Sequence, residues 1–437
     1  MMLLAGKNGR KETLRIQGAH VVDPGDGIDA VLDVSVVDGT VAALEQPGAP
    51  TVRDERLVDA HGLVLAPAFV DPHVHLRTPG REDEEDLASG ARAAAAGGYC
   101  AILAMPNTDP VVDTAAVLTA LRERARAEAD VPVGFLAAIT KEQAGERLTE
   151  MVELAEAGAA GFTDDGKPVA SPSLLRRALQ YGASAGRPIA LHCEEQSLSR
   201  GGHMHEGETS AELGVGGHPS VAESIMVARD LALAAYERRS PHLLHISARE
   251  SVEELRRARE AGVAATAEAT PHHLCLTDEA VRSLDPNLKM NPPLRGEEDR
   301  NALLEALRDG TIGAIATDHA PHARHEKEVP FESAPFGVTG LETAFAALNT
   351  RLVEPGVVPL ATLLERMSAG PARIYGLEPP RVSPGAEANL VLLDLEASWR
   401  VEEAQLRSKS ANSWVLGKTL QGRVLMTIAA GRLAFSA

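Results

Sequence analysis

Between residues 63 and 316, short apolar runs alternate with longer segments in which apolar residues recur every three or four positions. The apolar runs are typical of buried strands, and the periodic segments are typical of amphipathic helices. The predicted strands are 63–70, 99–105, 131–139, 160–162, 188–191, 242–244, 263–267 and 313–316. Helices are predicted between most of them, at 84–96, 115–129, 146–157, 173–184, 222–238, 248–260 and 297–309.

Eight strands that alternate with helices over about 300 residues predict an α/β fold with a (β/α)8 TIM barrel. A doubly wound open sheet is the alternative architecture. Because no G-x-G-x-x-G sequence follows the first predicted strand, the barrel is favoured over the open sheet.

The two ends of the chain carry a different pattern, with strand-like runs at 14–22, 31–44, 389–394 and 423–435. No helix-length periodic segment interrupts the first two runs. We expect both ends to build one small β-sandwich, in which residues 1–66 and 376–437 flank a barrel at 67–375. The mostly polar residues before position 13 are expected to fray.

Composition narrows the classes of function. The chain has 437 residues, of which 44% are apolar and 24% charged, as in a soluble globular protein. Its net charge of −19 argues against nucleic acid or an anionic membrane surface as a partner. No apolar run is long enough to span a bilayer, and the apolar start at 1–5 is too short for a secretory signal. Cys100, Cys193 and Cys275 lack C-x-x-C spacing, so we expect reduced thiols and a cytoplasmic location.

Two histidines, His73 and His75, stand at alternate positions directly after the first predicted strand. Alternate side chains of an extended segment point to the same side, so both imidazoles can reach one metal ion. Arg77 has the same parity and would place a cationic fork, suited to a carboxylate, beside that metal. The stretch therefore indicates a metal site with a carboxylate anchor at its edge.

Further metal-ligating side chains follow the ends of other predicted strands, where a barrel of this kind carries its catalytic residues. The set comprises His73, His75, His192, His245, Asp318 and one of the adjacent Asp164 and Asp165. Four histidines and two carboxylates on one face are the ligands expected for one or two divalent ions of the zinc type. Chemistry alone does not decide between the adjacent Asp164 and Asp165.

Longer motifs carry a resemblance to a known family. They are DPHVHLR at 71–77, AAAAGG at 93–98, MPNT at 105–108, TDDG at 163–166, LHCE at 191–194, KMNPPLR at 289–295, TDHAPH at 317–322 and PFGVTGLET at 335–343. With these motifs the chain resembles the dihydroorotases of the bacterial type I class, which are cyclic amidohydrolases of the amidohydrolase superfamily. The resemblance covers nearly the whole length.

The resemblance implies a zinc centre with one or two ions per subunit. His73, His75 and Asp318 would bind the first ion, His192 and His245 the second, and Asp165, favoured over Asp164, would bridge them. The implied reaction is the reversible cyclisation of N-carbamoyl-L-aspartate to L-dihydroorotate in pyrimidine (UMP) biosynthesis. A metal-bound hydroxide would be the nucleophile, and Asp318 would be the general acid and base.

The resemblance also implies a substrate site. Arg77, Asn107 and His322 would hold the substrate carboxylate, Asn291 and the backbone of Phe336 and Gly337 would contact the ring, and His75 would border the same site. The charged segment 321–336 is interpreted as a loop over the mouth, either a lid or a solvated surface loop. His272 and His273 are expected to support the site without ligating a metal.

Alternative functions follow from related chains. The first alternative function is that of a hydantoinase or an allantoinase. Relatives that hydrolyse hydantoins bridge their metals with a carboxylated lysine, whereas this chain has Asp165 at that place. An inactive scaffold for aspartate carbamoyltransferase is the second, and such scaffolds lack the ligands that this chain keeps. The resemblance implies a homodimer, and it leaves association with aspartate carbamoyltransferase open.

Overall fold

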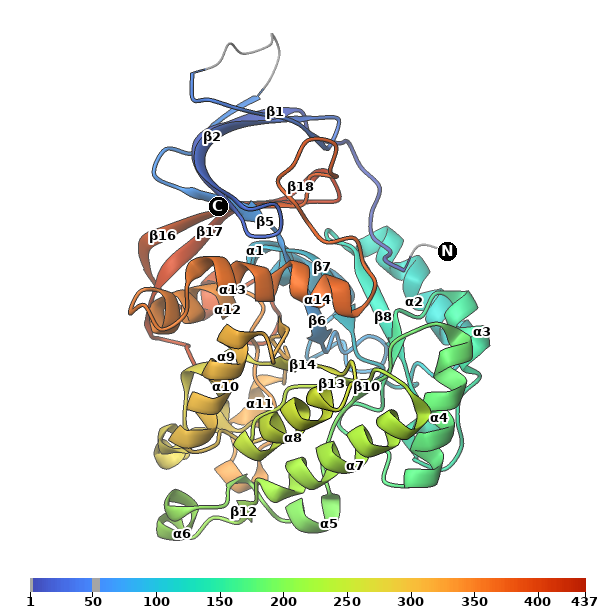
Figure 1. Ribbon diagram of the computed structural model, residues 1–437. Helices are drawn as coiled ribbons and strands as arrows, with labels where there is room; N and C mark the ends of the chain where they lie inside the picture. The colour runs from blue at the N-terminus through green and yellow to red at the C-terminus, as the bar shows by residue number, and fades with distance from the viewer. Residues whose placement is uncertain (1–2, 49–55) are drawn as a thin grey trace.

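The computed structural model describes residues 3–48 and 56–437. It has two parts, a barrel and a sheet made from both ends of the chain, which is drawn in blue and red at the top of Figure 1. Within the described ranges, no helix combines the length and apolar composition needed to cross a membrane.

Eight parallel strands form the barrel. Four of them pair in one sheet, namely β6 (Phe69–Val74), β7 (Tyr99–Ala104), β8 (Val133–Ala137) and β9 (Gly161–Phe162). The other four are β10 (Ala190–Leu191), β13 (His242–Leu243), β14 (Thr266–Ala269) and β15 (Ala314–Ile315). Parallel bridges between Phe162 and Ile189 and between Val74 and His319 join the two halves. The TIM barrel predicted from the sequence is therefore confirmed.

The seven predicted helices are present in the barrel. They are α1 (Leu87–Ala96), α2 (Ala115–Glu128), α3 (Met151–Ala157), α4 (Pro172–Ala185), α7 (Val221–Glu237), α8 (Arg249–Glu260) and α10 (Glu297–Asp309). Shorter helices lie in the loops and near the C-terminal side, namely α5 (Gln196–Ser199), α6 (Glu208–Leu213), α9 (Pro271–Cys275), α11 (Arg324–Lys327), α12 (Ala344–Leu348), α13 (Leu360–Met367) and α14 (Ala369–Ile374). A small pair of strands, β11 (Met204–His205) and β12 (Gly217–His218), lies in the loop after β10.

Helix α1 shows how local sequence fixes the barrel. Asp86 caps its first turn by accepting a hydrogen bond of 2.7 Å from the backbone N–H of Ser89. At its end, a Cβ on Gly97 would lie 2.1 Å from the carbonyl oxygen of Leu341, so a side chain is excluded there. The glycine lets the chain turn into β7 against the neighbouring segment.

The terminal sheet contains eight strands in one hydrogen-bonded network. From the N-terminal end come β1 (Leu14–Asp23), β2 (Ile28–Val37), β3 (Thr40–Glu45), β4 (Arg56–Asp59) and β5 (Val64–Pro67). From the C-terminal end come β16 (Leu390–Arg400), β17 (Thr419–Ala429) and β18 (Arg432–Ser436). Antiparallel pairing of β5 with β16 joins the two groups, and both contribute to one buried apolar cluster separate from that of the barrel.

Two expectations about strands and ends were wrong. The predicted strand 63–70 is two strands in different sheets, because β5 ends at Pro67 and β6 begins at Phe69. The expected fraying of the first residues is also contradicted. Ala5 is buried and exchanges backbone hydrogen bonds of 2.8 and 2.7 Å with Val133 of the barrel, which ties the start of the chain to β8.

Candidate metal centre

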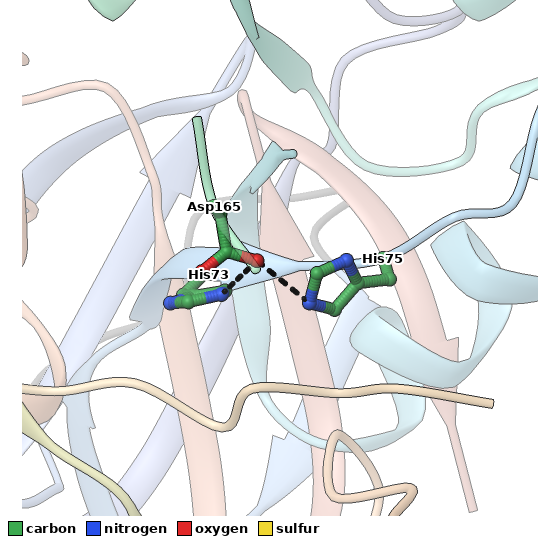
Figure 2. A group of neighbouring side chains, drawn as sticks. All are labelled: His73, His75 and Asp165. Atoms are coloured by element: carbon green, nitrogen blue, oxygen red, sulfur yellow. Dashed lines mark ion pairs between the residues drawn. The ribbon is translucent and has the colours of Figure 1, made fainter. Parts of the chain in front are cut away.

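Six predicted ligands meet at the carboxyl end of the barrel around the carboxylate of Asp165. Its Oδ2 atom lies 3.5 Å from Nε2 of His73 and 3.5 Å from Nε2 of His75, as Figure 2 shows. Its Oδ1 atom lies 3.5 Å from Nδ1 of His192 and 3.3 Å from Nε2 of His245. The two oxygens of one carboxylate thus face two separate pairs of imidazoles.

Asp318, which follows β15, completes the cluster on one side. Its Oδ1 atom lies 3.1 Å from Nε2 of His75 and 3.4 Å from Nε2 of His73. All six side chains are buried or nearly so. Two trios of ligand atoms, each sharing Asp165, are close enough to hold a metal ion.

The donor set fits a divalent metal. Imidazole nitrogens and carboxylate oxygens in buried trios match the ligands of zinc-type sites. Nε2 of His73 is buried and makes no hydrogen bond within the described chain. Since buried polar atoms normally have a partner, this nitrogen is a candidate metal ligand.

Protonation compensates the charges of the cluster in the metal-free chain. Burial disfavours ionised carboxylates, but the charge of His73 and hydrogen bonds from other imidazoles outweigh it, so the pKa values of Asp165 and Asp318 lie below their ordinary range. Burial lowers the pKa of His192, yet its contacts with Asp165 and Glu194 raise that pKa to about 10. A divalent cation would displace these imidazole protons.

Outer partners turn three of the four imidazoles toward the centre. Nδ1 of His73 lies 2.8 Å from Oε1 of Glu268, and Nδ1 of His75 lies 2.9 Å from Oδ1 of Asn107. Nε2 of His192 lies 2.9 Å from Oε2 of Glu194. In each case the other ring nitrogen faces Asp165, which is the arrangement that outer carboxylates and amides impose on metal-binding histidines.

Glu268 was not predicted as a site residue. It is fully buried in β14 and also lies 3.0 Å from Nε2 of His242, a histidine outside the cluster. The seventh strand was predicted to end at Ala267, whereas β14 runs to Ala269. The sequence did contain one indication of a role for Glu268, which is its position between two alanines at the end of an apolar strand. A carboxylate is rarely buried in such a strand unless it has a partner.

Of the two adjacent aspartates, only Asp165 faces the histidines. Asp164 accepts hydrogen bonds from the backbone N–H groups of Ile139 at 2.8 Å and Thr140 at 3.1 Å, and from the Thr140 hydroxyl. Its carboxylate therefore holds the chain after β8.

Three residues of the site have left-handed backbone conformations unusual for side chains other than glycine. Their φ angles are +54° at Arg77, +27° at His245 and +48° at Asp318. Such conformations cost free energy and persist where the surrounding structure enforces them. At Asp318 the support includes Asp71, which accepts a hydrogen bond of 3.1 Å from the backbone N–H of the preceding Thr317.

The predicted substrate-site residues line one cavity of about 270 Å³ beside the cluster. Its lining includes His75, Arg77, Asn107, Asn291, His322, Phe336 and Gly337, together with Asp165, His192, His245 and Asp318. Nε of Arg77 lies 2.8 Å from Oε2 of Glu84 and donates to the carbonyl of Pro321 at 3.0 Å. Nε2 of His322 lies 2.7 Å from the carbonyl oxygen of Phe336. The cavity thus combines a cationic edge with a cluster of metal-ligating groups.

Other predicted features lie around this cavity. His273 contacts the Thr270 hydroxyl at 2.8 Å and the Pro292 carbonyl at 2.9 Å, so it holds neighbouring chain segments. Segment 321–336 contains α11 and is tied to the barrel by two lysines. Lys327 donates to the carbonyls of Pro286 and Pro335, and Lys289 donates to those of Phe331 and Glu332.

Comparisons with known proteins agree with this geometry. A family described as Dihydro-orotase-like matches residues 62–251. The chain is 44% identical to the dihydroorotase of Syntrophus aciditrophicus over 96% of this chain and 98% of that protein. It is 46% identical to the dihydroorotase of Geobacter sp. strain M21 over 97% of this chain and 99% of that protein.

Solved structures of similar fold include the L-hydantoinase of Arthrobacter aurescens, with a TM-score of 0.86, 26% identity and coverage of 97% of this chain and 96% of that chain. The dihydropyrimidinase of Brevibacillus agri NCHU1002 has a TM-score of 0.80 at 21% identity, with coverage of 96% of this chain and 94% of that chain, and shows the fold alone. The identity to dihydroorotases over nearly the full chain shows that this protein belongs to the dihydroorotase family of amidohydrolases.

Proposed function

We propose that the protein is a metal-dependent dihydroorotase, which interconverts N-carbamoyl-L-aspartate and L-dihydroorotate plus water in pyrimidine (UMP) biosynthesis. The observation that carries the proposal is the single cavity that holds Arg77 and His322 beside the His/Asp cluster. A cyclic amide that bears a carboxylate needs both groups at once. Identity of 44–46% to proteins named dihydroorotase supports the same reaction.

The proposed cofactor is Zn²⁺, with one or two ions per subunit. His73, His75 and Asp318 would hold one ion, His192 and His245 the other, and Asp165 would lie between them. This assignment is supported by the two buried trios that share Asp165. When bound, zinc would activate water near neutral pH and polarise the carbonyl of the scissile amide.

Asp318 is proposed as the general acid and base. It lines the cavity, and its contacts with His73 and His75 both involve Oδ1, while no hydrogen bond to Oδ2 is found within the described residues. A carboxylate with one oxygen free can take a proton from the attacking water and deliver it to the ring nitrogen that leaves. In the cyclisation direction it removes the proton from the ureido nitrogen.

Arg77 and His322 are proposed to anchor the substrate carboxylate, with Asn107 beside them. Nε of Arg77 is used by Glu84 and Pro321, and its NH2 atom lies 3.5 Å from Nε2 of His322. The terminal nitrogens of the guanidinium remain for a carboxylate. Asn291 and the backbone of Phe336 and Gly337, which line the same cavity, would contact the ring.

The division into a terminal β-sandwich, 1–66 with 376–437, and a barrel at 67–375 is also proposed. It is supported by one apolar cluster that is confined to the two ends of the chain, while the larger cluster contains residues of both parts. The homodimer, the cytoplasmic location and association with aspartate carbamoyltransferase stay predictions from the resemblance.

The direct test measures the metal content of the purified chain together with its hydrolysis of dihydroorotate, hydantoin and allantoin. We expect one or two zinc ions per chain and fastest turnover of dihydroorotate. Faster turnover of hydantoin or allantoin would overturn the substrate assignment. A metal-free chain that stays inactive after zinc is added would favour the inactive scaffold.

Replacing Arg77, the proposed anchor of the substrate carboxylate, makes this test more specific. Arg77→Met is expected to raise the KM for dihydroorotate about 10- to 100-fold, because a charge-assisted hydrogen bond to the substrate is lost. Metal content and residual hydrolysis of dihydrouracil, the same ring without a carboxylate, should not change. Arg81→Met is the matched control, since Arg81 also pairs with Glu84, at 2.9 Å, but does not line the cavity. An unaltered KM in Arg77→Met would remove Arg77 from the proposed role.

A further inference from the structure

The carboxylate of Glu194 connects the metal-ligating cluster with Asn291, a residue that lines the catalytic cavity. Its Oε2 atom lies 2.9 Å from Nε2 of His192 and accepts a hydrogen bond of 2.9 Å from Nδ2 of Asn291. Its Oε1 atom accepts a hydrogen bond from the hydroxyl of Ser199 in α5. One side chain thus contacts a predicted metal ligand and a predicted ring contact.

Glu194 fixes which nitrogen of His192 faces the cluster. An ionised carboxylate only accepts hydrogen bonds, so Nε2 of His192 must carry the proton of the neutral ring. The lone pair is then on Nδ1, which lies 3.5 Å from Oδ1 of Asp165 and 3.0 Å from Nε2 of His245. A histidine held in this tautomer is ready to bind a metal through Nδ1.

Glu194 also fixes the orientation of the Asn291 amide. Since Nδ2 donates to the carboxylate, a 180° flip would place the amide oxygen against a negative charge. Oδ1 of Asn291 is buried and accepts no hydrogen bond within the described chain, although the residue lines the catalytic cavity. A buried carbonyl oxygen without a donor is costly, so a donor on the ligand is its natural partner. The ring N–H of dihydroorotate and the ureido N–H of carbamoyl aspartate are such donors.

A second cavity of about 420 Å³ shares lining residues with the catalytic cavity. Glu194, Ser199 and Asn291 line it, and Asn291 and Phe336 also line the catalytic cavity. The Glu194–Asn291 hydrogen bond is therefore part of the wall between the two cavities. Without it, water from the second cavity would compete for Nε2 of His192 and for the Asn291 amide.

We propose that Glu194 is a positioning residue that couples metal binding at His192 to recognition of the substrate N–H by Asn291. The inference rests on the proposed function, because it takes the ring of dihydroorotate as the partner of Asn291. Loss of the carboxylate should weaken metal affinity and substrate binding together, although Glu194 itself touches neither the metal nor the reacting atoms.

The test is Glu194→Gln, which keeps the shape but removes the negative charge that strengthens the two hydrogen bonds of Oε2, so that His192 and Asn291 are held only by weaker bonds to a neutral amide. We expect zinc affinity, measured by competition with a chelator, to fall about 10- to 100-fold. At saturating zinc, the KM for dihydroorotate should still rise about 10-fold, with a smaller change in kcat. Glu195→Gln is the matched control, since its carboxylate bonds to Ser197 and contacts neither His192 nor Asn291 among the described residues.

A double-mutant cycle separates coupling from simple damage. Asn291→Ala should raise KM and leave zinc affinity unchanged, and adding Glu194→Gln should raise KM no further. Ser199→Ala removes only the third contact of Glu194 and should shift zinc affinity and KM in the same directions by a smaller factor, which keeps the test open if Glu194→Gln does not fold.

The outcomes distinguish two failures. Additive KM effects in the double variant, or a Glu194→Gln protein with zinc affinity and KM within twofold of the parent, would overturn the coupling. Absence of dihydroorotate turnover in the parent chain would overturn the proposed function instead, and the zinc affinities would still report on the His192 contact.

Discussion

Two buried clusters of charged side chains, one in the terminal sheet and one in the barrel, are built in opposite ways. In the sheet, Asp33 Oδ2 accepts hydrogen bonds of 3.1 Å from Arg15 and from the backbone N–H of Gly48. Its Oδ1 accepts one of 2.8 Å from the backbone N–H of Gly18, and Arg15 also donates to Glu45 at 2.8 Å. Both oxygens of the buried acid are occupied at hydrogen-bonding distance.

In the barrel, the four distances from Asp165 to the histidines are 3.3–3.5 Å, longer than good hydrogen bonds. The ring nitrogens facing Asp165 lie 3.0–3.1 Å from one another or from Asp318 at the nearest, and Nε2 of His73 makes no hydrogen bond among the described residues, while the opposite nitrogens of His73, His75 and His192 are bound at 2.8–2.9 Å. The sheet cluster is closed around the carboxylate of Asp33 and stabilises the fold, although Nε of Arg15 is buried without a hydrogen bond among the described residues, and the barrel cluster is open toward its centre. The difference indicates where a ligand belongs, and three substitutions test it.

The largest effect is expected from Asp318→Asn, in the open cluster. Without the general acid and base, kcat for dihydroorotate should fall about 1,000-fold. The free energy of unfolding should fall by less than in the closed cluster, because the amide keeps nearly the same shape, although the loss of a carboxylate whose pKa lies below its ordinary range removes some stability. Steady-state assays on zinc-loaded protein and urea unfolding measure the two quantities. Activity within tenfold of the parent would exclude the role of Asp318.

Arg15→Met, in the closed cluster, should have the reverse effect. The side chains of Arg15 and Asp33 are both 2% exposed, so removing the arginine leaves a buried carboxylate without its cation. We expect the free energy of unfolding to fall by about 3 kcal/mol, while kcat of the folded protein stays unchanged. If stability were unaffected and kcat fell, the assignment of stabilising and catalytic clusters would be wrong. Arg10→Met, before β1, is a control for loss of positive charge.

Glu268→Gln is expected to have the smallest effect. Glu268 makes short contacts with His73 and His242, as the groups of the closed cluster do with one another. It nevertheless belongs to the open cluster, because it orients the predicted ligand His73. An amide can satisfy only one of these two imidazoles in their present tautomers, so zinc affinity should fall about 10-fold. Glu260→Gln, on the exposed end of α8, is the control. Equal zinc affinity in both variants would show that Glu268 does not orient His73.

Much of this site was predictable because its residues lie either at alternate positions of one extended segment or directly after the ends of barrel strands. Alternate positions placed His73 and His75 on one side, and the carboxyl ends of the strands brought Asp165, His192, His245 and Asp318 together. The outer partners were harder to predict. Glu268 lies in an apolar strand, where neither periodicity nor motif marks a polar role, and Glu194 is recognised only once His192 and Asn291 are placed in space.

The fold was predictable where all the apolar residues of a segment pack into the same hydrophobic core. Residues 63–70 are apolar throughout, and the one local sign that β5 and β6 are separate strands is Pro67, which cannot donate a ladder hydrogen bond and ends β5. The start of the chain was mispredicted because a single buried residue, Ala5, pairs with β8, and one residue has no periodicity. Residue chemistry alone left the choice between Asp164 and Asp165 open, since adjacent residues share the same sequence context; the resemblance favoured Asp165, and in the structure it is Asp165 that faces the histidines.

The pairing of β5 with β16 has a consequence for biosynthesis. β5 leaves the ribosome with β1 on one side, and its other edge waits for residues 390–393, which are made only after the whole barrel. Throughout that interval the nascent chain exposes an unpaired strand and half of an apolar cluster, both of which favour aggregation. A chain that stops before residue 390 would keep every proposed metal ligand, and yet we expect it to be lost to aggregation.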